Sequence, residues 1–479
     1  MIRTNAALFF ALLCLCMPWT ANAESVLPDL GGVSASPLSA EQEYKLGRSW
    51  LRQIRGQLPI LSDPLIQEYS ENLVYRLASH SDLEEPDLAI IVINSKDINA
   101  FAVPGGVIGL NLGLYLNAAN EDEVAAVVAH EIAHVSQHHF GRRLVESQRM
   151  NKAVLAAMLA SLAVAIAGDA EAGMAGIMTS QAAAIHSQLA YSRNQEREAD
   201  RVGMHTLVSA GMDPEAMASF FEILLRGQQL NSRPPEFLMT HPITEDRIAD
   251  ARGRARTLPT VLLHDSLHFR LIKARVSSGF LGSPENAVAH FRSQFKSTGD
   301  SLHRQTTAYG LAVSYLRNRE YDKAREILSK LAAHHPNEYW YRLGLAEIDQ
   351  AEERHEDAMM RLRDLQELMP GNYAVTVMLA YSQIKSGQPK QAQALLRPLL
   401  HQRPSDAGLW RLAADAWGKE GELAEAHLAR GEYLFLNGRD DAALAQMRYA
   451  LDNSKKSFPL HSRIKARLHE METQSKEEK

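Results

Sequence analysis

Cysteine is nearly absent from this chain of 479 residues, which contains only Cys14 and Cys16. An excess of one charge is also missing, since 51 Lys and Arg face 57 Asp and Glu and the formal net charge is −6. Because no long basic stripe occurs either, the sequence argues against nucleic acid as a partner. The content of 46% hydrophobic and 23% charged residues argues against a disordered or fibrous chain. The length indicates about two or three domains.

The N-terminus has the features of a secretion signal. Arg3 supplies a positive charge, residues 6–17 form an apolar run, and Ala21-Asn22-Ala23 has the small-x-small pattern that signal peptidase accepts. The run is shorter than the ~20 residues that a membrane-spanning helix needs. We predict that residues 1–23 are a cleaved signal peptide, which removes both cysteines and excludes disulfides from the mature chain. An uncleaved anchor is the alternative.

A second apolar segment covers residues 153–167, interrupted only by Ser161. As a helix it would reach about 22 Å, short of the ~30 Å hydrocarbon core of a membrane. We therefore predict a buried or surface-lying hairpin, with peripheral contact to a membrane as a possibility. A flap near the active site is the functional alternative.

The N-terminal half alternates helical and strand patterns. Residues 39–55 and 63–78 carry apolar side chains at helical spacing. Residues 88–93, 100–103 and 107–110 are short β-branched or apolar runs around Pro104-Gly105-Gly106, which predicts a small sheet with a sharp reversal. Asn120 and Glu123 form a capping-box pattern before a helix that runs to about residue 138 and is apolar nearly all round.

The C-terminal half repeats with a period of 34 residues. The positions in register are Ala324, Ala358, Ala392 and Ala426; Pro336, Pro370 and Pro404; Leu328, Leu362 and Leu396; and the Leu-Ala pairs that begin at 311, 345 and 379. This period, with small residues at helix crossings and proline at the end of each unit, is typical of tetratricopeptide repeats. Such a superhelix offers a concave surface to another polypeptide.

These patterns predict a mostly α protein of two domains. An α+β domain with a small sheet is expected over residues 24–263. An all-α tetratricopeptide-repeat superhelix is expected over residues 264–479. The boundary is set by the break in helical pattern near residues 254–263.

The motif that carries chemistry is His130-Glu131-Ile132-Ala133-His134 in the buried helix. Residues four apart share a helical face, so both imidazoles can bind one metal ion while Glu131 reaches a water on that ion. Two histidines and a glutamate in an apolar helix would be costly to bury without such a partner.

A catalytic zinc site of this kind needs a third protein ligand. No histidine follows His134 at the metzincin spacing, so a downstream carboxylate is favoured. Residues 194–200 offer Glu196, Glu198 and Asp200, of which Glu196 and Asp200 are four apart and share a face. Glu196 would bind the metal ion and Asp200 would orient a ligand histidine. A solvated helix face is the alternative interpretation of this stretch.

Taken together, four motifs resemble the HtpX/Ste-type zinc metallopeptidase family. They are Asn99 to Gly106, residues 119–134, Ser192-Arg193 with Glu196 and Asp200, and His241-Pro242 with Arg247. The signal sequence and the repeats resemble the periplasmic branch of that family in Gram-negative bacteria, which combines a protease with a chaperone.

The resemblance implies that residues 24–263 form a zincin-like metallopeptidase domain. It implies one Zn²⁺ per chain, held by His130, His134 and Glu196. It implies that Glu131 is the general base and that Glu198 lies off the motif. Asp200 would be a second acid group or would orient a ligand. It further implies that residues 103–110 run beside the zinc helix as an edge strand to which an extended substrate adds.

Two further residues remain open at this point. His241 is either part of a simple turn or a group that approaches the zinc, where it would stabilise an oxyanion or close the site as a gating ligand. Arg247 would stabilise developing charge or bind Glu196 or Asp200.

The sequence thus favours a periplasmic zinc endopeptidase with chaperone-like activity in outer-membrane protein quality control. By the resemblance, its substrates are unfolded or stalled outer-membrane proteins and its partner is the β-barrel assembly machinery. The alternative is a tetratricopeptide-repeat chaperone or adaptor with secondary or silent proteolysis. A purely structural metal is disfavoured, because such a site normally has four protein ligands and no use for Glu131.

Overall fold

The computed structural model describes residues 39–84, 87–146, 192–230, 235–259, 261, 266–296 and 300–477. The predicted signal peptide and the apolar segment 153–167 lie outside these residues. Within the described part of the chain, no helix is both long and apolar enough to cross a membrane.

The predicted small sheet has three strands, β1 (Ala89–Ile93), β2 (Ala100–Val103) and β3 (Val107–Asn111), in the order β1-β3-β2. β2 and β3 form the predicted hairpin, since they pair antiparallel across a turn in which Gly105 and Gly106 have φ of 73° and 71°. Glycine suits that left-handed backbone because it has no Cβ. β1 pairs parallel with the other side of β3.

The prediction of an edge strand over residues 103–110 is wrong. β3 is the central strand, and β2 is the edge of the sheet on that side. The parallel pairing with β1 covers the second side of β3. The other edge of the sheet, along β1, is bridged by the preceding chain, where Leu61 N–H donates to Val92 O at 2.9 Å and Ile60 pairs with Ile93.

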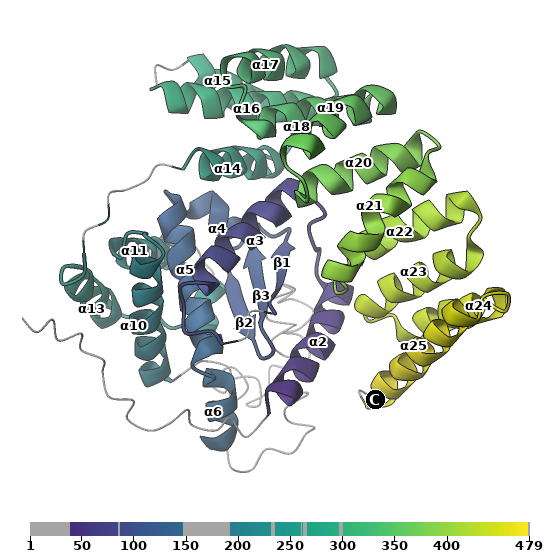
Figure 1. Cartoon of the computed structure of the whole chain (residues 1–479). Helices are drawn as coiled ribbons and strands as arrows, with labels where there is room; N and C mark the ends of the chain where they lie inside the picture. The colour runs from purple at the N-terminus through teal and green to yellow at the C-terminus, as the bar shows by residue number, and fades with distance from the viewer. Residues whose placement is uncertain are drawn as a thin grey trace, which may run out of the picture. The chain divides into compact units, whose positions relative to one another are not determined.

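Along β2, the backbone groups of successive residues point alternately toward β3 and toward the outer edge of the sheet. Asn111 N–H donates to Asn99 O at 3.0 Å, so alternate residues of the hairpin direct their backbone groups inward. The backbone groups of Ala100 and Ala102 therefore point outward. The Ala102 N–H faces the Glu131 carboxylate, and just before the strand Ile98 O accepts from Phe237 N–H at 3.3 Å. Helix α5 (Glu121–Ser136) packs against this strand (Figure 1).

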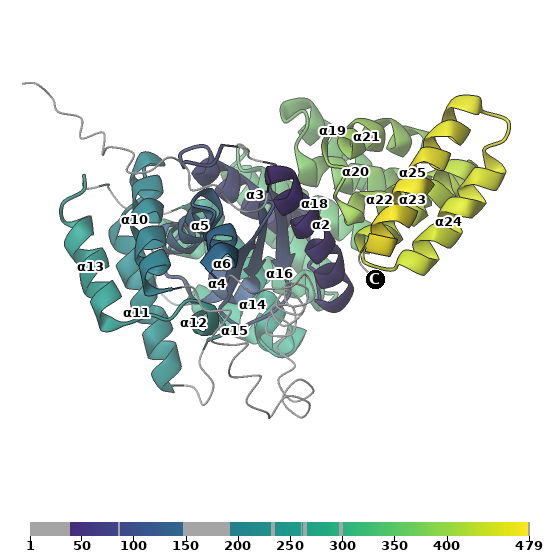
Figure 2. The same cartoon turned by 90° about the horizontal axis from the view of Figure 1, so that it is seen from below.

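The peptidase half contains eight more described helices: α2 (Ala40–Gln57), α3 (Pro64–Ala78), α4 (Leu112–Asn117), α6 (His139–Glu146), α10 (Arg193–Ser209), α11 (Glu215–Leu230), α12 (Phe237–Thr240) and α13 (Glu245–Ala255). Alternate strand residues enter two cores. Phe101 and Ile91 pack with Trp50 of α2, whereas Ala102 and Val92 join the core that contains α3 and α5. Figure 1 and Figure 2 both show α5 between the sheet and α10.

The C-terminal half is a succession of helices that pack on their neighbours in the chain. They are α14 (Leu267–Phe280), α15 (Pro284–Lys296), α16 (Ser301–Arg317), α17 (Tyr321–His334), α18 (Tyr339–Ala351), α19 (His355–Leu368), α20 (Tyr373–Lys385), α21 (Pro389–Gln402), α22 (Ala407–Glu420), α23 (Leu423–Leu436), α24 (Asp440–Asn453) and α25 (Phe458–Glu477). Ala324, Ala358 and Ala392 have no exposed surface, as expected of close helix crossings. The predicted fold class is confirmed.

The repeat helices contact the peptidase half at several points. The Arg52 guanidinium of α2 lies 3.5 Å from the Phe435 ring centroid, donates from Nε to Phe435 O at 2.9 Å and pairs with Asp440. On α3, Glu68 accepts from Asn372 Nδ2 at 2.5 Å. Both contacts are buried or partly buried, so they hold the repeats against the helices that flank the sheet.

Candidate metal centre

Helix α5 delivers the two predicted histidines to one point. Asn120 caps its N-terminus by accepting from Glu123 N–H at 3.0 Å. The reciprocal half of the predicted capping box differs, because the Glu123 carboxylate accepts from Ala119 N–H. His130 and His134 lie one turn apart, both buried, and their Nε2 atoms are 3.0 Å from each other.

Helix α10 supplies the carboxylate. Ser192 and Gln195 form a complete capping box that fixes the first turn, where Glu196 stands. Farther along, Gly203 brings α10 close to α5, since a Cβ at this position would lie 3.0 Å from the His130 backbone nitrogen. As a result Glu196 Oε1 is 3.5 Å from His134 Nε2, and Oε2 is 3.6 Å from His130 Nε2.

His241 completes the group from the segment after α12. Its Nδ1 lies 3.0 Å from Glu196 Oε1 and 3.3 Å from His130 Nε2. The Phe237 ring stacks on the imidazole, with centroids 4.6 Å apart. One possible ligand atom from each of His130, His134, Glu196 and His241 lies within 4.8 Å of the others.

The donor set fits a metal ion. Burial lowers the pKa of His134 well below its usual value, so its ring is neutral at pH 7. Burial opposes ionisation of Glu196, but His241 and His134 outweigh it and hold the pKa of this carboxyl well below its usual value. Neutral imidazole and ionised carboxylate are the forms that bind metals, and two ring nitrogens 3.0 Å apart suit a shared cation.

Glu131 lies beside this group but makes a different set of contacts. It is buried, and its Oε1 is 3.5 Å from His241 Nε2. Burial raises the pKa of Glu131, and the opposing influence of His241 and His130 is too small to cancel it.

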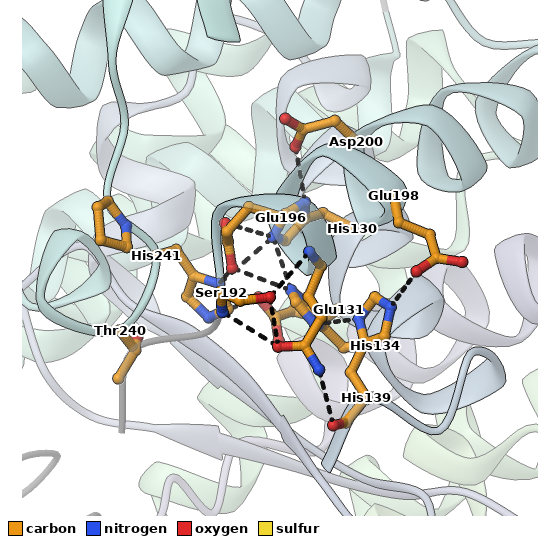
Figure 3. Close-up of polar contacts among 12 residues, drawn as sticks. His130, Glu131, His134, His139, Ser192, Glu196, Glu198, Asp200, Thr240 and His241 are labelled. Atoms are coloured by element: carbon orange, nitrogen blue, oxygen red, sulfur yellow. Dashed lines mark hydrogen bonds and ion pairs between the residues drawn. The ribbon is translucent and has the colours of Figure 1, made fainter. Parts of the chain in front are cut away.

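Asp200 contacts the first histidine on its far side (Figure 3), and Arg247 contacts Asp200 in turn. Asp200 Oδ1 lies 3.0 Å from His130 Nδ1, as the four-residue spacing to Glu196 predicts. Arg247 donates from Nε and Nη2 to the two oxygens of Asp200, at 2.8 and 2.7 Å, and from Nη1 to Pro242 O. Its Nη1 also lies 2.7 Å from Glu196 Oε2, so both predicted partners of Arg247 are found together.

Two residues that support the group have no role in the sequence analysis: His139, which contacts His134, and Glu198, which contacts His139. The fully buried His139 places Nδ1 2.8 Å from His134 Nδ1, and its Nε2 is 3.1 Å from Glu198 Oε2. Burial lowers the pKa of His139 to about 4, so this ring is neutral at pH 7. The signal that the sequence offers is a histidine shortly after the helix of His130 and His134, whereas the family motif does not include Glu198.

Comparison with known proteins matches both halves of the chain. The model of peptidase family M48 matches residues 64–255, and tetratricopeptide-repeat models match residues 309–362 and 350–416. These matches confirm the peptidase resemblance and the repeats.

Curated relatives extend the similarity over nearly the whole chain. The putative beta-barrel assembly-enhancing protease of Vibrio cholerae is 34% identical and covers 90% of this chain and 90% of its own length. The beta-barrel assembly-enhancing protease of Escherichia coli is 33% identical and covers 95% of this chain and 93% of its own length. Metalloprotease LoiP of Escherichia coli, 27% identical, covers 47% of this chain and 88% of its own length.

The chain is thus a metalloendopeptidase by the M48 match and by its metalloprotease relatives, and the structure contains a cluster that could hold the metal ion such an enzyme needs. Since two relatives above 30% identity align over at least nine tenths of their length, the chain belongs to the family of beta-barrel assembly-enhancing proteases, with a peptidase half of family M48.

Proposed function

We propose that this chain is a periplasmic zinc endopeptidase that cleaves unfolded or stalled outer-membrane proteins, with one Zn²⁺ bound by His130, His134 and Glu196. The observation that carries the proposal is the buried convergence of these three side chains next to Glu131. Zn²⁺ held there would activate water and polarise a peptide carbonyl.

Glu131 is the proposed general base. Its raised pKa suits a group that takes a proton from the attacking water and then passes it to the leaving amine. Its position one residue after His130 puts it on the neighbouring face of α5, so it stays close to the metal ligands without competing for their place.

Asp200 is proposed to orient a ligand rather than to act as a second acid. A carboxylate 3.0 Å from Nδ1 of His130 accepts the hydrogen on that nitrogen and leaves Nε2 with a lone pair toward Glu196. Arg247 neutralises this buried carboxylate with two hydrogen bonds. Both oxygens of Asp200 are thereby occupied, which leaves it poorly placed to exchange protons with substrate.

The outer edge of β2 is the proposed substrate site. An extended polypeptide would pair with the outward backbone groups of Ala100 and Ala102, next to α5, by adding a strand. This mode requires a segment free of its own secondary structure, so it selects unfolded or looped chains.

His241 is proposed to be a fourth ligand in the resting enzyme, and its side chain would have to move before substrate is cleaved.

The repeats are proposed to bind the partner or the substrate. The relatives are named for enhancing β-barrel assembly, which supports outer-membrane proteins as substrates and the β-barrel assembly machinery as the partner. The N-terminal pattern of residues 1–23 supports export to the periplasm. A chaperone role of the repeats, independent of cleavage, is part of the same proposal.

The test is Glu131→Gln in the full chain. We expect about one equivalent of zinc to be retained and cleavage of unfolded casein to fall by about 10²–10⁴-fold, the usual contribution of a general base. Removal of the metal ion with 1,10-phenanthroline should abolish cleavage by the wild type, and added Zn²⁺ should restore it. Normal turnover by Glu131→Gln, or a wild type that binds no zinc, would refute the proposal. Any assembly function that survives in this variant belongs to the chaperone role.

A further inference from the structure

A second series of polar contacts, separate from that of Asp200, reaches the metal centre through His134. The Nδ1 atom of this ring lies 2.8 Å from Nδ1 of His139, while its Nε2 faces His130. His139 in turn places Nε2 3.1 Å from Glu198 Oε2, and Arg142 donates from Nη1 to the same oxygen at 3.0 Å. Figure 3 shows the contact between His139 and Glu198 beside the ligand group.

The direction of these hydrogen bonds follows from the donor and acceptor capacity of each group. An ionised carboxylate only accepts, so Nε2 of His139 carries a hydrogen toward Glu198. A neutral imidazole has one such hydrogen, so Nδ1 of His139 is an acceptor. The short contact to His134 then requires the hydrogen on Nδ1 of His134, and its Nε2 is left with a lone pair toward the other ligands.

We infer that His139 and Glu198 are positioning residues, which hold His134 in the tautomer and orientation that bind the metal ion. The inference rests on the proposed zinc site. Each of the two histidines is then supported by a carboxylate. Asp200 contacts Nδ1 of His130 directly, and Glu198 acts on His134 through His139.

The backbone at the end of α5 and at the start of α10 places both the proposed ligand Glu196 and the residues that support His134. Helix α5 ends before His138, whose φ of 48° interrupts the helical backbone, and α6 begins at His139. Gln195 Nε2 donates to the His139 carbonyl at 3.2 Å, which anchors this turn to the first turn of α10. Glu196 stands in that first turn and Glu198 two positions later, so the two side chains leave the helix in different directions. The ligand and the support of its neighbour are thus fixed by one capping box.

The first experiment compares two substitutions of His139 in the full chain. His139→Leu removes the acceptor, whereas Asn in His139→Asn can place its Oδ1 near the position of Nδ1 and still accept from His134. Zinc affinity is measured by competition with a chelating dye, and ligand geometry by the visible spectrum of the Co²⁺-substituted protein. We expect His139→Leu to weaken zinc binding by about 10–100-fold and to alter the Co²⁺ spectrum, as loss of an outer-shell partner does. His139→Asn should recover most of the affinity.

His138→Asn is the matched control, because the His138 side chain is partly exposed and contacts Glu43, and because asparagine tolerates positive φ. It should leave affinity and spectrum unchanged. Glu198→Ala and Glu198→Gln form a second pair of variants. Because Glu198 is partly exposed, these variants test the positioning role even if the buried His139→Leu fails to fold. Glu198→Ala should weaken zinc binding, and Glu198→Gln, which keeps an acceptor oxygen, should weaken it less.

Unchanged affinity and an unchanged Co²⁺ spectrum in folded His139→Leu or Glu198→Ala would overturn the inference. Equal losses in His139→Leu and His139→Asn would overturn it too, because they would indicate packing alone. A wild type that binds no zinc would instead refute the proposed metal site, so the two failures are distinguishable.

Discussion

Two buried glutamates at the metal centre have opposite shifts in pKa. Glu196 lies beside Arg247 and within 3.6 Å of three histidines, and these histidines outweigh its burial and hold its pKa well below the usual value. The nearest charged contact of Glu131 is one histidine nitrogen at 3.5 Å, and burial raises its pKa. Groups whose surroundings push their pKa values apart are suited to different tasks. Glu196 is therefore a permanent anion fit to bind a cation, and Glu131 a carboxyl that can exchange a proton.

His241→Ala tests whether the third histidine restrains the enzyme. We expect zinc to be retained by the other three ligands and casein cleavage to increase. If the resting contact is worth about 1.4 kcal/mol, the increase is about tenfold. Thr240→Ala, which loses only a side-chain hydrogen bond to Phe237 O, is the control for the turn. Unchanged turnover in His241→Ala would contradict a gating role.

The site was predictable from sequence where local geometry decides it. Helical periodicity alone brings His130 and His134 together, and the same spacing joins Glu196 to Asp200. The contact of His139 with His134 depends on the positive φ of His138, just after α5 ends. No periodic pattern in the sequence predicts that backbone conformation. The sequence leaves open whether His241 approaches Glu196, 45 residues away, because this contact depends on how α12 packs against α5. The roles assigned to all these residues remain predictions.

At the scale of elements, the distance between α5 and α10 sets the size of the metal centre. Gly203 permits the approach, since a Cβ there would lie 3.0 to 3.1 Å from backbone atoms of residues 129 and 130. Backbone cannot rotate away as a flexible side chain does, so any larger residue has to separate the helices.

Gly203→Ala should therefore loosen the centre. We expect a loss of about 1–3 kcal/mol in the free energy of unfolding, as overpacking usually costs, together with weaker zinc binding. Gly253→Ala on α13, where a Cβ would meet nothing within 4 Å, is the matched control and should stabilise by up to about 1 kcal/mol. Urea denaturation and dye competition measure both quantities. Equal zinc affinity in the two variants would contradict this account.

The contact between α3 and α20 carries a pH dependence. Burial raises the pKa of Glu68 from 4.5 to about 7, against the hydrogen bonds from the 374 backbone and Asn372. The folded state thus keeps a proton that the unfolded state has released above pH 4.5. The free energy of unfolding should fall as pH rises from about 4.5 to 7, by about 3 kcal/mol at most.

Glu68→Gln should remove this part of the pH dependence. Denaturant titrations of both proteins at pH 5 and pH 8 give the comparison, and the loss of stability between the two pH values should be smaller in the variant. Parallel losses in the two proteins would show that Glu68 does not titrate in this window.

The sheet illustrates the limit of element prediction. The two β-runs around Pro104 predicted their hairpin correctly, because the turn residues are adjacent in sequence. The position of β1 beside β3 joins residues 18 apart in parallel, and the sequence pattern is equally compatible with β1 on either side of the hairpin. That choice decides whether residues 107–111 lie at the edge or in the centre.

At the scale of the whole molecule, the far end of the repeats is tied to the first described helix. Arg52 of α2 bonds Phe435 O of α23, stacks on the Phe435 ring and pairs with Asp440 of α24. These partners are more than 380 residues away in sequence, so the contact closes the C-terminal helices onto the peptidase half. The predicted division at residues 263 and 264 remains a prediction, since one apolar core includes residues from both halves.

Arg52→Ala should release α23 and α24 first. Removing one partner of a buried ion pair typically costs about 3–5 kcal/mol, and the amides of these two helices should exchange hydrogen faster than those of α5. Lys45→Ala on the same helix, which breaks an exposed pair with Glu41, should change stability by less than about 0.5 kcal/mol. Uniform acceleration of exchange over the chain would show that Arg52 supports global stability instead.

The bridge from residues 60 and 61 to β1 also limits how many chains the sheet can accept. Within residues 89–111 the bridge covers the edge along β1, so only the edge along β2 could pair with another chain through the backbone. A single extended segment saturates it. Two copies that paired through β2 would stop at a dimer, because neither would retain a second edge for a third copy, and this sheet cannot template a fibre.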